Sequence, residues 1–104
     1  MANNTVMLEM DKARNLKYTF NTLIDIEEDF EKTIAEITGS MTMKDARTLL
    51  FHGLKWEDKK LTKEMTGNLI SEYVENGGTF KELMETVGKA FTKALGNSAA
   101  PSTK

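Results

Sequence analysis

The side chain best suited to acid–base chemistry is His52, the only histidine among the 104 residues of the chain. An imidazole titrates near neutral pH and can act as a general base. No serine, cysteine or paired carboxylate accompanies His52 at a spacing typical of a catalytic set, although spacing alone leaves open a set assembled in space. We therefore interpret His52 as a structural residue and expect no enzyme activity.

A run of acidic residues could hold a hard cation such as calcium. Glu27, Glu28 and Asp29 are consecutive, and Asp25 and Glu31 lie nearby. Calcium loops place their ligands at an Asp-x-Asp-x-Asp-Gly spacing, which this segment lacks. We interpret the run as the solvated face of a helix.

Gly77 and Gly78 precede a predicted helix start, where backbone amides could cradle a phosphate. The Gly-Lys-Ser/Thr ending of a phosphate-binding loop is missing, so the end of the preceding helix explains these glycines better. Zero cysteines and a single histidine exclude a disulfide framework, a thiolate nucleophile and a multi-histidine metal cluster. We expect no catalytic, cofactor or metal site.

The elements that position these residues begin with two strands. Alternating apolar and polar residues predict strands over Thr5–Met10 and Leu16–Phe20, and the polar segment Asp11–Asn15 predicts the hairpin turn between them. A lone hairpin is marginal in water and needs a helix on its apolar face. That face is expected to carry Val6, Leu8, Leu16, Tyr18 and Phe20.

Helical spacing follows the hairpin. It predicts a first helix capped by Asn21, a short helical turn over residues 33–38, and a central helix over residues 42–54 capped by Thr42 or Ser40. The first helix would bury Leu23, Ile26 and Phe30, and the short turn Ile34 and Ile37. The central helix is apolar around much of its circumference, so it must be covered on several sides.

Two closing helices complete the pattern. Thr62 caps a helix that ends at residues 76–78, and Thr79 with Glu82 forms a capping box that opens the last helix. The first of these helices carries a stripe of Met65, Leu69, Ile70, Tyr73 and Val74. The last helix carries Phe80, Leu83, Met84, Val87, Phe91 and Leu95.

The predicted fold class is therefore α+β and mostly α-helical, with an N-terminal β-hairpin followed by four to five helices. Residues 1–96 are expected to form one domain. Residues 97–104 are small, polar and aperiodic, and are expected to form a disordered tail.

The last helix is the best candidate for binding a partner. Its stripe of Phe80, Met84, Val87 and Phe91 is more apolar than a small core needs, and methionine suits adaptable surfaces. We predict partner or self contact there. The alternative, that the stripe only closes the core over Leu50 and Leu54, stays equally open.

A resemblance to a known family rests on three segments that follow one another along the chain. They are Leu-Lys-Tyr-Thr-Phe-Asn-Thr-Leu at residues 16–23, Leu-Leu-Phe-His-Gly-Leu at residues 49–54, and Leu-Thr at residues 61–62, before a helix. Their spacing resembles the tail assembly chaperones of long-tailed phages and prophages and the related small protein of gene transfer agents. The resemblance runs from about Val6 to Gly96.

The resemblance implies a non-enzymatic chaperone that binds the tape measure protein, keeps it soluble and assists assembly of the tail tube. It implies the tail tube protein as a further partner, self-association, a place in the cytoplasm of a bacterial host, and absence from the mature particle. Some relatives also occur in a longer, frameshifted form.

Two other functions compete with this reading. One is a small structural component of the particle, such as a tail or connector protein. The other is a helix-turn-helix regulator with Lys81, Lys89 and Lys93 facing DNA, but Glu82 and Glu85 offset those lysines and the net charge is -2. We therefore expect no nucleic-acid partner. No apolar run is long enough to span a membrane, and the first residues lack the pattern of a signal peptide, so we expect no membrane partner.

Overall fold

The computed structural model describes residues 5–39 and 41–95. It consists of an antiparallel hairpin followed by five helices, which confirms the predicted α+β, mostly helical class. Ser40 and the predicted tail 97–104 lie outside the described residues. The elements are β1 Thr5–Glu9, β2 Ala13–Lys17, α1 Phe20–Phe30, α2 Ile34–Gly39, α3 Met43–Leu54, α4 Lys63–Glu75 and α5 Phe80–Ala94.

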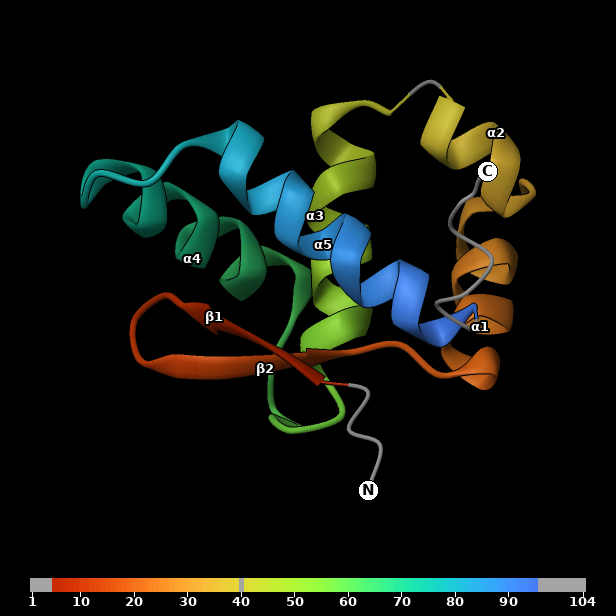
Figure 1. The fold of residues 1–104 in the computed structure, drawn as a ribbon, viewed down its shortest axis with the longest axis horizontal. Coiled ribbons are helices and arrows are strands. Elements are labelled where there is room, and N and C mark those ends of the chain that lie inside the picture. Colours follow the sequence, from red (N-terminus) through yellow and green to blue (C-terminus); the bar gives the residue numbers. More distant parts are fainter. Residues whose placement is uncertain (1–4, 40, 96–104) are drawn as a thin grey trace.

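Helix α3 lies at the centre of the molecule, as its apolar circumference requires. It contacts β2, α1, α4 and α5, and Figure 1 shows α5 crossing in front of it above the hairpin. The helix begins with a capping box in which Thr42 Oγ accepts from the amide of Asp45 and the Asp45 carboxylate accepts from the amide of Thr42. The predicted bounds and the Thr42 cap are confirmed. Its buried apolar residues include Ala46, Leu49, Leu50 and Leu54.

The second strand lies three residues earlier than predicted. It pairs with β1 in the register Val6 to Leu16 and Leu8 to Arg14. The turn is tight, since the Met10 amide donates to the Lys12 carbonyl at 3.0 Å, and this brings Ala13 directly into the ladder. Of the predicted turn Asp11–Asn15, Asp11 and Lys12 lie in the turn, whereas its extension to Asn15 was wrong.

The same shift moves the start of the first helix. Thr19, not Asn21, is the N-cap of α1, because its hydroxyl accepts from the amide of Thr22 at 3.1 Å. Phe20 is consequently the first helical residue rather than the end of a strand, and 69% of it is exposed. Its assignment to the core face of the hairpin was wrong, whereas Leu8, Leu16 and Tyr18 are buried.

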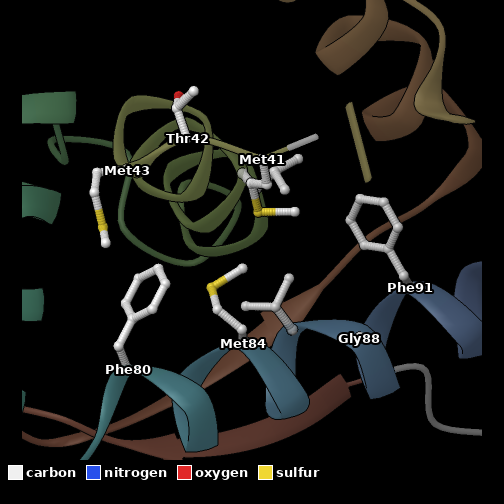
Figure 2. Close-up of a pocket in the computed structure, with 9 residues that line it drawn as sticks. Met41, Thr42, Met43, Phe80, Met84, Gly88 and Phe91 are labelled. Atoms are coloured by element: carbon white, nitrogen blue, oxygen red, sulfur yellow. The ribbon is translucent and has the colours of Figure 1, made fainter. Parts of the chain in front are cut away.

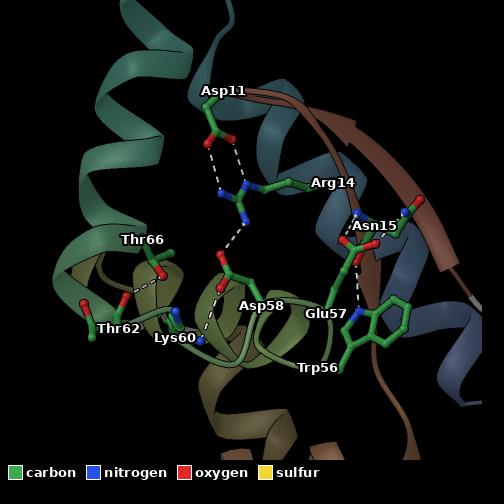
Figure 3. A network of polar contacts seen from close by, with 9 residues as sticks. All are labelled: Asp11, Arg14, Asn15, Trp56, Glu57, Asp58, Lys60, Thr62 and Thr66. Atoms are coloured by element: carbon green, nitrogen blue, oxygen red, sulfur yellow. Dashed lines mark hydrogen bonds and ion pairs between the residues drawn. The ribbon is translucent and has the colours of Figure 1, made fainter.

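Polar contacts attach the connector between α3 and α4 to the hairpin (Figure 3). Arg14 is buried and binds Asp11 through Nε and Nη2 at 2.7 and 2.9 Å, while its Nη1 lies 3.3 Å from Asp58 Oδ2. The hydrogen bonds from Arg14 hold the pKa of Asp11 below its ordinary value. A buried guanidinium with two carboxylate partners keeps its charge compensated.

The two closing helices begin at the predicted caps, Thr62 and Thr79, and the capping box of Thr79 and Glu82 is confirmed. Helix α4 ends at Glu75 with Asn76 as its C-cap, and Gly77 follows with a φ of 106°, a conformation that costs glycine little. The prediction of a buried apolar stripe on α4 was only partly right. Leu69 is buried, but Met65 and Val74 are exposed, so α4 turns only part of this stripe toward α3.

Tyr18, which follows β2, joins the hairpin to both central helices. Its hydroxyl donates to the Leu49 carbonyl of α3 at 2.7 Å, and its ring meets Phe91 of α5 edge-on with ring centroids 4.6 Å apart. Burial raises the pKa of the hydroxyl, so it stays a donor. The ring fits because residue 53 is glycine. A Cβ at this position would lie 2.6 Å from Tyr18 Cζ.

Gly53→Ala is expected to destabilise the fold by about 1–3 kcal/mol, because overpacking outweighs the better helix propensity of alanine. Gly88→Ala in α5 is the matched control, since a Cβ there meets nothing within 4 Å. This control should gain about 0.5–1 kcal/mol. Urea unfolding followed by the fluorescence of the single tryptophan measures both changes. Equal stability of the two variants would contradict the close fit at Tyr18.

Candidate functional site

An apolar groove opens between α5 and the N-terminal end of α3. Its volume is about 410 Å³. Figure 2 shows Phe80, Met84 and Phe91 on α5 facing Met41 and Met43 across it. The lining residues are Met41, Thr42, Met43, Leu49, Phe80, Met84, Val87, Gly88 and Phe91. All four residues predicted for partner contact therefore lie in one hollow.

The four predicted residues divide into two pairs. Val87 and Phe91 are buried and belong to the core, and Phe91 packs on Tyr18. Phe80 and Met84 are only half-buried, at the N-terminal end of the helix. The core interpretation therefore describes Val87 and Phe91, and an accessible apolar surface remains at Phe80 and Met84.

Two further lining residues were not predicted as part of this site. Met41 and Met43 flank the cap of α3, and 71% of Met43 is exposed. The high methionine count was the only sequence signal for them, because their distance from α5 depends on how the two helices cross. Gly88 lies one turn beyond Met84 and presents no side chain to the groove.

The apolar surface continues past Met43 and Phe80. A second hollow of about 440 Å³, on the α4 side, shares these two residues and adds Lys44, Arg47, Gly67 and Ile70. Lys44 and Arg47 have no ion-pair partner within residues 5–39 and 41–95, and Nε of Arg47 is buried there without a hydrogen bond. The surface is thus elongated, apolar along its length and basic at one end.

His52 lies away from this groove and bonds to α1. Its Nε2 is 2.9 Å from Asp29 Oδ2, and Lys63 Nζ is 2.9 Å from the same oxygen. The other ring nitrogen, Nδ1, is shielded from solvent and has no partner among the described residues. A base needs a free nitrogen within reach of its substrate, so this geometry favours the structural interpretation.

The charge states in this cluster follow from burial and from its lysines. Burial lowers the pKa of His52, Lys55 and Lys63 act in the same direction, and the hydrogen bond to Asp29 opposes them. Burial alone would raise the pKa of Asp29, but the hydrogen bonds from His52 and Lys63 outweigh it and lower that pKa. We infer a neutral imidazole that donates from Nε2 to an ionised carboxylate.

Two residues of the acidic run and two of the lysines considered above face other parts of the chain. Glu27 Oε2 accepts from the Ile34 amide at 2.8 Å, and Asp29 binds His52. Among the described residues, no group of three or more acidic or histidine side chains is placed to hold a metal ion. Lys89 and Lys93 lie beside β1. In the described part of the chain, no helix is long and apolar enough to cross a membrane.

Comparisons of the chain with protein-family models, with curated proteins and with solved structures find no match. A function is therefore inferred from the groove and from the sequence motifs.

The neutral state of His52 predicts a pH-dependent stability. Its pKa is lowered in the folded chain, so the unfolded chain binds more protons once the pH falls below the ordinary histidine value, and folding stability falls with it. Between about pH 7 and pH 5, where Asp29 stays ionised, wild-type protein should lose stability as the pH falls. Urea midpoints across this range measure the effect.

His52→Gln is the control, because an amide can donate to Asp29 without titrating. Its stability should vary less over the same range, since the chain has no other histidine. A wild-type midpoint that is constant, or that falls no more than the midpoint of the variant, would refute the neutral buried imidazole.

Proposed function

We propose that this chain is an assembly chaperone that holds an amphipathic helix of a larger protein in the groove between α5 and the start of α3. In accordance with the resemblance of its motifs, the larger protein is the tape measure protein of a phage or prophage tail, and the tail tube protein is a further partner. The single observation that supports this proposal best is the apolar groove with methionines on both sides.

The shape of the surface favours a helix over a small ligand. The groove and the second hollow lie on either side of Met43 and Phe80, so together they suit a partner longer than either. Helix-in-groove recognition uses apolar residues at helical spacing that enter such a surface in succession. Lys44 and Arg47 at one end favour a partner helix with an acidic residue near that end.

The side chains of the groove suit a chaperone that contacts many similar segments. Methionine is unbranched and polarizable, so Met41, Met43 and Met84 can adapt to different partner side chains without a change of backbone. The buried Val87 and Phe91 hold α5 in place beneath them. A groove with a rigid base and adaptable methionine side chains can bind apolar segments of different sequence, and a long helical partner presents many such segments.

Co-expression with the tape measure protein of a phage tail tests the proposal. The soluble yield of that protein should rise when the chain is present, and size-exclusion chromatography should recover a complex. Met43→Glu and Met84→Glu should each weaken the complex by about tenfold or more, because each places a charge in the apolar groove. Met43 is the safer site for the fold, since it is exposed at the first turn of α3.

Met65→Glu is the matched control, because it makes the same change at an exposed methionine of α4 outside the groove. This variant should bind as the wild type does. An unchanged yield with wild-type chain, or an equal loss with Met65→Glu, would count against the groove. Presence of the chain in purified particles would instead favour the structural-component function.

A further inference from the structure

The two outer edges of the hairpin differ. Side chains from the connector after α3 occupy the edge of β2 (Figure 3): Glu57 Oε1 accepts from the Asn15 amide at 3.1 Å, and Trp56 Nε1 donates to the Asn15 carbonyl at 2.9 Å. Strand β2 thus has a partner along each edge, β1 along one and the connector along the other.

The strand register shows which groups of β1 point outward. Asn15 directs its amide and carbonyl away from β1, so the pair of Asn15 with Met7 is one that exchanges no hydrogen bonds. The amide and carbonyl of Met7 therefore point away from β2, toward the outer edge. The Thr5 carbonyl, two residues earlier, agrees with this assignment because it accepts from Lys93 Nζ at 3.3 Å.

The main chain of Met7 has no hydrogen-bond partner on this edge within residues 5–39 and 41–95. The side chain is 60% exposed. An open hollow of about 460 Å³ runs beside the edge, lined by Thr5, Val6, Met7, Lys89, Thr92 and Lys93. An uncovered edge of this kind is a template for another strand.

The charges along the edge make it complementary to itself. Lys93 lies at the Thr5 end, where its Nζ donates to the Thr5 carbonyl, and the exposed Glu9 lies at the other end without an ion-pair partner among the described residues. In an antiparallel pair of two such strands, each positive end meets a negative end. A parallel pair would bring like charges together.

We propose that two copies of this chain associate through β1, antiparallel about Met7, to form one four-stranded sheet. Met7 pairs with the partner's Met7, and the two exchange both main-chain hydrogen bonds. Thr5 pairs with the partner's Glu9, which comes beside Lys93. The contact is isologous, so each interaction occurs twice. It uses neither the α5 groove nor the proposed function, and it can be tested without any other protein.

A single cysteine at the twofold axis tests the geometry. Residues in a hydrogen-bonded antiparallel pair have Cα atoms about 5.5 Å apart, within the range that a disulfide spans. The chain has no cysteine, so Met7→Cys can only form a disulfide between copies. Under mild oxidation it should form covalent dimer about tenfold or more faster than Met65→Cys, an exposed control on α4 outside both proposed contacts. Equal rates for the two variants would overturn the proposal.

Non-covalent variants test the hydrogen bonds and the charges. Met7→Pro removes an amide that points away from β2, so the hairpin should keep its ladder while the dimer dissociation constant rises about tenfold or more. Glu9→Lys and Lys93→Glu should each weaken the dimer, and the double variant should recover it, because the swap restores opposite charges.

Sedimentation equilibrium measures these constants, and circular dichroism checks that each variant is folded. A wild-type chain that stays monomeric at its highest soluble concentration would refute the proposal, as would folded Met7→Pro that dimerises as tightly as wild type. Loss of partner binding by the groove variants with the dimer unchanged would affect the proposed function alone.

Discussion

The arrangement of the whole chain depends on how Tyr18 is buried. One side chain, at the end of β2, donates to the Leu49 carbonyl of α3 and packs edge-on against Phe91 of α5. Burying a hydroxyl without a hydrogen-bond acceptor costs free energy, so this bond fixes where the hairpin lies on α3. The ring can approach so closely only because Gly53 has no side chain. Phe91, held by the same ring, is also part of the floor of the groove.

A second constraint fixes the hairpin from its other side. Arg14 carries a charge into a buried position and is compensated by Asp11 and Asp58, and the latter belongs to the connector after α3. The same connector supplies Trp56 and Glu57 to the edge of β2. Removing one partner of a buried charge costs more than the pair contributes, so these contacts form as a set. Their position on β2 leaves β1 as the uncovered strand.

The sequence was sufficient to predict those features that depend only on residues close together in the chain. Caps need only residues three apart, and Thr62 and Thr79 were predicted outright, while Thr42 was one of two candidates. The second strand was misplaced because the alternation of Leu16, Tyr18 and Phe20 continues past Thr19, the actual N-cap of α1, so the local pattern does not show where the strand stops. The groove was half predicted for a similar reason. Its α5 side is a periodic stripe, whereas Met41 and Met43 face it only through the crossing of α3 and α5.

Helix α5 brings both proposed contacts onto one rigid element. Its first turns carry Phe80 and Met84 at the groove, and its last turns carry Lys89 and Lys93 at the edge of β1. Between them, Val87 and Phe91 are buried in the core, so neither surface can move without the other. In the proposed dimer each copy would keep its groove open, because the groove and the hollow beside β1 share no lining residue, and the pair would present two grooves at a fixed separation. A long partner with repeated apolar segments would bind such a pair more tightly than one copy, because its second contact forms at a high effective concentration.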